Sequence, residues 1–214
     1  MVNAGLKAIV DMLFPPHRDV VVAHSVSKET LKPLFVLSLR SESSVYTGLP
    51  YAHEGVRALI KANKYYRDAH SSSVLALILR DMICDIERTR EKKSDKNIPL
   101  LVPVPTAPTR ARRRGAHQVK RILEALPSDI KNTYQYADVL SRHDRPSQTK
   151  VPKNKRADNI AGAFFVPVHL HSTVRGQTIF LIDDVTESGA TLGDATRALF
   201  EAGATDIIRV ALAK

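Results

Sequence analysis

The chain has 214 residues, of which 43% are hydrophobic and 25% charged, a composition that favours one globular domain with an elaboration over two large domains. No run approaches the roughly 18 uninterrupted apolar residues of a membrane span. The apolar run over residues 8–14 is broken by Asp11 and lacks a signal-peptide cleavage pattern, so we expect a cytoplasmic protein without a membrane partner. The single cysteine, Cys84, excludes an internal disulfide, and we interpret it as a small buried hydrophobe.

The formal net charge of +10 is concentrated in two segments. Residues 106–121 hold six basic and no acidic side chains, and residues 141–158 hold six basic against two acidic ones. Together they carry the whole excess, so the remainder of the chain is neutral. A neutral scaffold with two cationic segments indicates an anionic partner, such as a phosphorylated metabolite or a nucleic acid, with a solvated basic surface as the alternative.

The first third of the chain has an irregular pattern. We predict a short helix over residues 1–14, ended by Pro15-Pro16, and strands at 20–25, 34–40 and 44–49. A helix then follows, because apolar residues recur at helical spacing in Leu75, Ile78, Leu79, Met82 and Ile86. We therefore predict an accessory region over residues 1–70 and a core domain over 71–214.

Strands and helices alternate from residue 98 onward. We predict strands at 98–104, 137–140, 178–183 and 206–211, a helix after Gly115, and a second helix over 192–202 that Gly203 caps. This alternation predicts an α/β core with a parallel sheet. Between Leu140 and Ala163 no periodicity is convincing, and because this long connection is basic we expect a mobile lid that is ordered by an anionic ligand.

The most informative stretch, residues 180–192, places two carboxylates directly after a buried strand. Asp183 and Asp184 end the apolar run, and a short loop with hydroxyl side chains and Gly189 leads into a helix. In a parallel α/β sheet, ligands bind at the carboxyl ends of the strands, and loop amides with a helix N-terminus hold phosphate. Carboxylates beside a phosphate repel it unless they bind sugar hydroxyls or Mg²⁺. The pattern thus predicts a ligand with a phosphate and a hydroxylated, metal-associated sugar.

This stretch resembles the phosphoribosyl pyrophosphate (PRPP) motif of the type I phosphoribosyltransferases, in which Asp-Asp-x-x-Thr-Thr-Gly-x-Thr follows three apolar residues. The resemblance implies the type I phosphoribosyltransferase fold, an α/β parallel-sheet core with helices on both faces and a small hood-like N-terminal layer. It also implies that the two acids hold the ribose hydroxyls, directly or through Mg²⁺, while the loop binds the 5′-phosphate. The implied PRPP-binding residues are Asp183, Asp184, Val185, Thr186, Glu187, Ser188, Gly189, Ala190 and Thr191.

Further motifs resemble the ComF-type, competence-associated members of that family. Residues 101–105 and 112–118 are similar to their Pro-Val-Pro and Arg-Gly-Phe-Asn-Gln signature, and residues 148–164 are similar to their catalytic loop. Upstream, residues 13–16 and the pair Lys64-Tyr65 are also similar. ComF-type proteins usually carry a cysteine-rich zinc element after the Leu-Phe-Pro-Pro stretch; no cysteine follows here, so we expect no such site.

The resemblance implies transfer of the phosphoribosyl group from PRPP, with Mg²⁺ as cofactor, to an unidentified base or amine, with release of pyrophosphate. A non-catalytic alternative is a PRPP-sensing or DNA-binding accessory factor related to DNA uptake. Nucleic acid and a second copy of the chain therefore stay open as partners, but no aromatic residues interleave the arginines as stacking platforms, so we favour pyrophosphate. Its expected contacts are Arg110, Arg114, Lys153 and Arg156.

Glu187 stands where the common motif has its first Thr. Because a carboxylate aimed at a phosphate would weaken binding, we expect its side chain to turn away from the phosphate while the loop amides hold the ligand. Purine-salvage phosphoribosyltransferases resemble the chain in placing an acid here, which implies that Glu187 is a general base and joins Asp183 and Asp184 as a catalytic residue. The alternative is a solvent-facing substitution in a protein that has lost catalysis.

Overall fold

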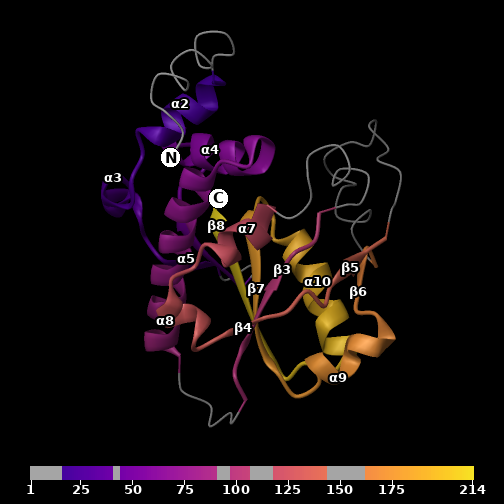
Figure 1. The fold of residues 1–214 in the computed structure, drawn as a ribbon. Coiled ribbons are helices and arrows are strands. Elements are labelled where there is room, and N and C mark those ends of the chain that lie inside the picture. The colour runs from indigo at the N-terminus through magenta and orange to yellow at the C-terminus, as the bar shows by residue number, and fades with distance from the viewer. Residues whose placement is uncertain (1–15, 41–43, 91–96, 107–117, 144–161) are drawn as a thin grey trace.

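A computed structural model describes residues 16–40, 44–90, 97–106, 118–143 and 162–214 (Figure 1). Its main sheet has six strands in the order β1-β2-β8-β7-β3-β4. In this order, each pair of neighbouring strands from β2 through β8, β7 and β3 to β4 is parallel. β1 pairs antiparallel with β2 at one edge of the sheet. The strands are β1 (Ser38–Arg40), β2 (Val45–Leu49), β3 (Leu100–Pro103), β4 (Gln135–Tyr136), β7 (Thr178–Val185) and β8 (Asp206–Ala213), with β5 (Ser141–Arg142) and β6 (Phe164–Phe165) in a separate antiparallel pair.

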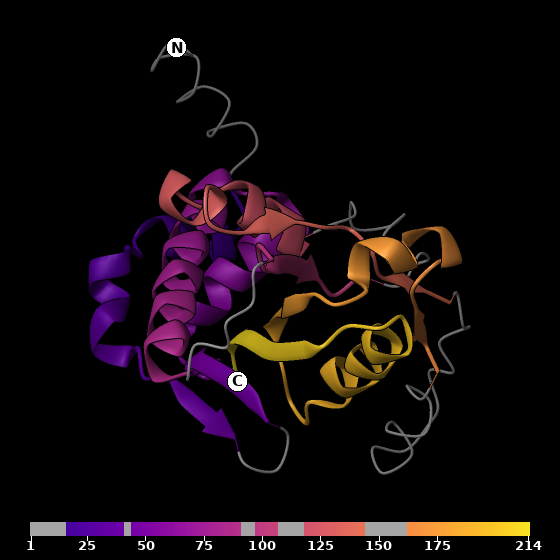
Figure 2. The same cartoon turned by 90° about the horizontal axis from the view of Figure 1, so that it is seen from below.

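Helices cover both faces of the sheet, as Figures 1 and 2 show. One face carries α2 (Arg18–His24), α3 (Lys28–Leu31), α4 (Glu54–Lys61), α5 (Ala69–Thr89), α7 (Gln118–Glu124) and α8 (Ser128–Lys131). The other carries α9 (His171–Val174) and α10 (Ala190–Glu201) together with the β5-β6 pair. Three shorter helical segments are η1 (Lys32–Leu34), η2 (Ala62–Tyr66) and η4 (Val168–Leu170). The predicted parallel-sheet α/β fold with helices on both faces is confirmed.

The central strand β7 supplies side chains to both hydrophobic cores. Phe180 and Ile182 pack into the core under α5, while Ile179 and Leu181 pack into the core under α10. All four side chains are fully buried. Successive residues of a strand point to opposite faces, so a strand covered on both sides has a continuous apolar sequence. Each such side chain contributes about 1.5–3 kcal/mol through burial, and together they fix β7 in the middle of the sheet.

Three predicted strands differ from the structure. Residues 20–24 of the predicted strand 20–25 belong to helix α2, and Ser25 is its C-cap. The helix buries Ala23 and packs Val20 and Val22 against the core while Val21 stays exposed, so tertiary packing outweighs the strand preference of three valines. In the predicted strand 34–40, Leu34 ends the η1 turn, which has Pro33 near its start, and strand pairing begins only at Ser38. Residues 137–140 form no strand, and pairing with β3 occurs instead at β4.

The other predicted elements from residue 44 onward are confirmed at positions close to those expected, and Gly203 follows α10 with φ 96°, as a glycine after a helix commonly does. The predicted helix over 1–14 lies outside the described residues. Within the ranges that the structure describes, no helix is both long and apolar enough to span a membrane.

Candidate functional site

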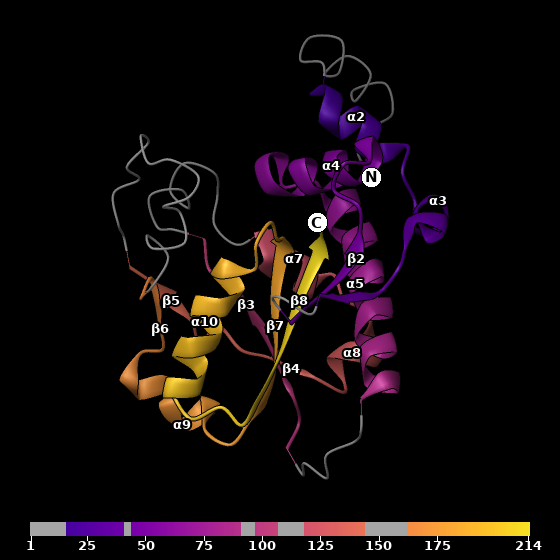
Figure 3. The ribbon, with the colours of Figure 1, turned by 180° about the vertical axis from the view of Figure 1, so that it is seen from behind.

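The two motif acids lie at the carboxyl edge of the sheet, in its middle. Asp183 and Asp184 are near the end of β7, with β8 beside Asp183 at Ala211 and β3 beside Ile182 at Pro103. The amide of Val104 still donates to the carbonyl of Ile182 over 2.9 Å, so β3 pairs with β7 as far as Ile182, and the acids lie just beyond this pairing. Figures 1 and 3 show α4 beyond these strand ends. The edge is therefore bounded by the accessory region, where a parallel sheet places its ligand.

Asp183 and Asp184 each accept the backbone amide of the next residue, over 2.9 Å in both cases. Asp184 is buried, and Asp183 is half-buried. Burial, together with the neighbouring Asp184 carboxylate, raises the pKa of Asp183 well above its usual value. A cation or hydroxyl donors at this position would stabilise the charged form of the carboxylates against burial and their mutual repulsion.

The loop that follows β7 is shaped by its own hydroxyl groups. Thr186 Oγ1 accepts the amide of Gly189 over 3.0 Å, and Ser188 Oγ accepts the amide of Ala190 over 3.4 Å. Gly189, with φ 77° and ψ −2°, is the N-cap of α10. A residue with a Cβ would be strained in this conformation, so glycine permits the tight turn into the helix. The loop is thus preformed, with its amides grouped at the positive end of α10.

The loop places Glu187 and Ser188 on the surface, whereas Thr186 and Gly189 are buried. Val185 ends β7, and Ala190 and Thr191 form the first turn of α10. The structure therefore gathers the residues predicted from the motif at one corner of the sheet edge.

Lys64 is a residue of this site that sequence reasoning did not assign to it. Its Nζ lies 3.5 Å from Oδ2 of Asp184, although the two residues are 120 positions apart. Lys64 is on η2, a π-helical continuation of α4 at the end of the accessory region. The Lys64-Tyr65 pair resembles the corresponding residues of ComF-type proteins, but no sequence spacing connects this pair with Asp183 and Asp184.

Asn63 holds the segment that carries Lys64 against α7. The fully buried Asn63 side chain donates to the carbonyl of Gln118 over 3.1 Å and accepts from Ser72 Oγ over 3.0 Å and from Arg121 Nε over 3.3 Å. A second nitrogen of Arg121 donates to the Asn63 carbonyl. Burial lowers the pKa of Arg121, and the nearby charge of Arg67 lowers it further. These contacts give η2 a fixed position at the site.

Asp194 links α10 to the β5-β6 pair. Its carboxylate accepts the amides of Gly162 over 2.8 Å and Phe164 over 3.0 Å, and Arg197 Nε donates to it over 3.0 Å. β5 and β6 lie on either side of residues 144–161 in the sequence, and the backbone amide of His143 donates to the carbonyl of Ala163 over 2.9 Å. Part of the segment 140–163 is thus paired in strands, contrary to the expectation that it lacks secondary structure.

The pyrophosphate contacts expected at Arg110, Arg114, Lys153 and Arg156 lie outside the described residues, as does most of the expected lid. The structure describes only their flanks. β3 leads toward Arg110 from the carboxyl edge of the sheet, and α7 begins at Gln118.

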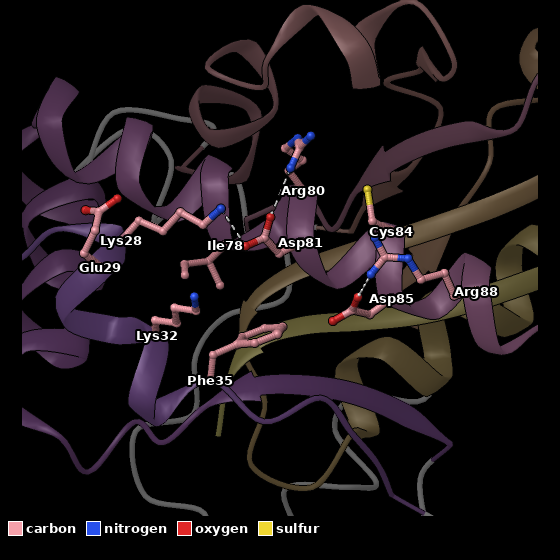
Figure 4. Close-up of a pocket in the computed structure, with 10 residues that line it drawn as sticks. All are labelled: Lys28, Glu29, Lys32, Phe35, Ile78, Arg80, Asp81, Cys84, Asp85 and Arg88. Carbon is pink, nitrogen blue, oxygen red and sulfur yellow. Dashed lines mark hydrogen bonds and ion pairs between the residues drawn. The ribbon is translucent and has the colours of Figure 1, made fainter.

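A cavity among the described residues lies elsewhere, between α5 and the α3-η1 segment (Figure 4). It has a volume of about 530 Å³, and ion pairs join Lys28 to Asp81 at 2.7 Å and Arg88 to Asp85 at 2.6 Å along its wall. A second cavity of about 300 Å³ lies beside Tyr134 and Tyr136. Neither is lined by the motif acids, so the chemistry of the sheet edge, and not volume, identifies the candidate site.

Comparison with known proteins agrees with this geometry. The phosphoribosyl transferase domain family matches residues 76–214, which include β3, β7, the acids, the loop and α10. The chain belongs to this family. The resemblance to type I phosphoribosyltransferases is thereby confirmed.

Two relatives of this phosphoribosyl transferase domain protein differ in how much they share with it. "Competence protein ComFC" of Streptococcus pneumoniae (strain ATCC BAA-255 / R6) is 32% identical over 108 residues, which cover 50% of this chain and 44% of the relative. The similarity to ComF-type members is thus confirmed over half of the chain. A structure described as the allosteric regulatory enzyme of purine biosynthesis matches 71% of this chain and 30% of its own chain. The TM-score is 0.40 and the sequence identity is 15%. That likeness is too distant to carry an argument about the site.

The side chains present fit the Mg²⁺ ion that PRPP binding in this family implies. Mg²⁺ prefers oxygen ligands and usually takes one or two carboxylates together with ligand phosphates and water. Asp183 and Asp184 supply adjacent carboxylates, and a cation would offset the burial and the Asp184 charge that raise the pKa of Asp183. These two residues would hold the cation.

Proposed function

We propose that this protein binds PRPP with Mg²⁺ at the carboxyl end of β7 and transfers the phosphoribosyl group to a nitrogenous acceptor. The observation that carries the proposal is the continuous order of β7, Asp183-Asp184, the turn at Gly189 and α10. This order places carboxylates for a sugar and amides for a phosphate within one short segment. The family match over residues 76–214 supports it.

Each part of the segment has a distinct role in the proposal. Asp183 and Asp184 bind the ribose hydroxyls, and Thr186 to Thr191 bind the 5′-phosphate through backbone amides and hydroxyl groups at the N-terminus of α10. The amides of Gly189 and Ala190 donate to the hydroxyls of Thr186 and Ser188 at 3.0 and 3.4 Å, so a phosphate held by these two amides would take the place of the hydroxyls. When bound, Mg²⁺ supplies positive charge that offsets the developing charge of the leaving pyrophosphate.

In the proposed transfer, the bond between the ribose C1 and the pyrophosphate oxygen breaks, and a bond forms between C1 and the acceptor nitrogen. Pyrophosphate leaves with the electron pair of the broken bond, and the acceptor nitrogen gives up its proton. In the proposal, Glu187, whose side chain is exposed in the loop after β7, takes that proton as general base. Catalysis then rests on the positioning of PRPP and acceptor and on charge stabilisation.

Calorimetry with PRPP and Mg²⁺ tests the binding step. Replacing both acids, Asp183→Asn and Asp184→Asn, should weaken PRPP binding by well over tenfold, which corresponds to about 1.4 kcal/mol or more. The Glu201→Gln variant, at the far end of α10, serves as a matched control and should bind like the parent. Unchanged affinity in the double variant would refute the proposed site.

A second candidate function is a non-catalytic accessory role in DNA uptake, with PRPP or DNA as ligand. The 32% identity to a protein named "Competence protein ComFC" favours it, and the two cationic segments of the sequence are compatible with binding to a nucleic acid strand. Fold alone does not decide between these functions.

A screen of bases and amines with PRPP and Mg²⁺, read as pyrophosphate release, separates the two functions. Release with one acceptor, and its loss in the double Asp variant, would establish the transferase. Failure with all acceptors, together with salt-sensitive binding of single-stranded DNA, would favour the accessory role.

A further inference from the structure

Asp184 has a cationic neighbour from the accessory region. Lys64 Nζ lies 3.5 Å from its Oδ2, and the two side chains are 26% and 5% exposed, respectively. The remaining carboxylate oxygen, Oδ1, accepts the amide of Val185. An ammonium group therefore lies beside Oδ2, the Asp184 oxygen that does not accept the amide of Val185, at a distance typical of a loose ion pair.

The segment that carries Lys64 is held in place by contacts that do not involve the acids. Asn63 anchors η2 to α7 and α5 through Gln118, Arg121 and Ser72, and the amide of Asp68 donates to the carbonyl of Ala62 over 3.3 Å. Lys64 itself is only half-buried, so its flexible side chain can leave Asp184 while the backbone of η2 stays fixed.

We propose that Lys64 and a divalent cation compete for Asp184, so that the ammonium neutralises this carboxylate before ligand binding and is displaced when the cation arrives. The inference rests on the proposed function, because the cation in question is the one that accompanies PRPP. A lysine and a divalent ion cannot both lie against one buried carboxylate oxygen without strong mutual repulsion. Lys64 thus sets how tightly the free protein holds a divalent cation.

Binding of Mn²⁺ alone tests this competition without PRPP. It is measured at low ionic strength from the electron paramagnetic resonance signal of free Mn²⁺. The Lys64→Met variant should bind Mn²⁺ about tenfold more tightly than the parent, because a positive charge a few ångströms from the cation has been removed. The Lys64→Arg variant keeps the charge and should retain the weaker affinity of the parent. Adding Asp184→Asn to Lys64→Met should abolish the gain.

Lys61→Met is the matched control, because Lys61 is three residues away and pairs with Asp19 at 3.7 Å instead of with a motif acid. It should leave Mn²⁺ affinity unchanged. Affinity of Lys64→Met equal to or below that of the parent, or absence of detectable binding in Lys64→Met, would overturn the proposal. Failure of PRPP binding in the calorimetric test would leave this result standing, so the two proposals fail separately.

A measurement on the unsubstituted protein avoids dependence on the folding of the variant. Mn²⁺ should increase the rate at which an amine-acetylating reagent modifies Lys64, measured by peptide mass spectrometry relative to Lys61, because the displaced ammonium becomes more accessible. An unchanged ratio at Mn²⁺ concentrations that saturate the protein would contradict displacement.

Discussion

The carboxylate of Asp194 accepts a hydrogen bond from the backbone amide of Phe164 over 3.0 Å and so joins α10 to β6. α10 begins at the proposed phosphate turn, and β6 follows the basic segment that lies outside the described residues. Arg197 reinforces the connection, since it donates both to Asp194 and to the carbonyl of Phe164 over 3.0 Å each. One buried carboxylate therefore fixes the relative positions of two segments near the candidate site.

Replacement of Asp194 by Asn should lower the free energy of unfolding by about 1–3 kcal/mol at neutral pH. The buried acceptor becomes neutral, and the NH₂ group of the new asparagine side chain faces one of the donors that the carboxylate had accepted. Burial by itself would raise the pKa of Asp194, but hydrogen bonds from Gly162, Phe164 and Arg197 outweigh it and lower the pKa below its usual value. The stabilisation is therefore complete above the pKa of the unfolded chain and is lost as pH falls through the folded pKa.

Denaturant unfolding at several pH values measures this effect. The difference between parent and Asp194→Asn should be constant above about pH 5 and shrink at more acidic pH. Glu201→Gln is the control: Glu201 pairs with the same Arg197 at 2.6 Å but is mostly exposed, so its loss should cost at most about 1 kcal/mol. A difference for Asp194→Asn that grows at acidic pH would contradict the assignment.

Replacement of Arg67 by Gly should stabilise the protein by about 0.5–1 kcal/mol, because Arg67 ends η2 in the left-handed region, with φ 54° and ψ 35°. Relief of this strain exceeds the entropy that glycine adds to the unfolded chain. Removal of the charge of Arg67 also relieves its repulsion of Arg121. Thermal unfolding should show a rise in Tm of roughly 1–4 °C.

The matched variant Arg57→Gly places the same substitution inside α4, where the backbone is helical. It should lower the free energy of unfolding by about 1 kcal/mol, as glycine does in helix interiors. A fall in Tm for both variants would show that the conformation of Arg67 is not strained.

Replacement of Glu187 by Gln tests the proposed general base. The change is nearly isosteric and removes only a negative charge beside the phosphate turn, so PRPP affinity should be unchanged or improved. Turnover with an acceptor found in the screen should fall by ~10²-fold or more. Equal turnover in parent and variant, measured as pyrophosphate release, would exclude this role and leave Glu187 as a surface substitution.

The residues of the motif were predictable because their arrangement is local. A continuous apolar run predicts a strand buried on both faces, and β7 has this environment. The acids, the turn at Gly189 and α10 follow within a few residues, so chain connectivity alone brings them to one corner. The same local logic predicted α5 from its apolar stripe and the glycine that follows α10.

What the sequence alone determined is thus the α/β fold, the position of the acids at the end of a central strand, and the family. Tertiary structure decided the helical state of residues 18–24, where burial of one face outweighs the strand preference of valine. It also decided that Lys64 lies against Asp184 and that Asp194 holds Phe164. These contacts join residues 120 and 30 positions apart, and no short-range pattern records them, because they depend on how the accessory region and α10 pack against the sheet.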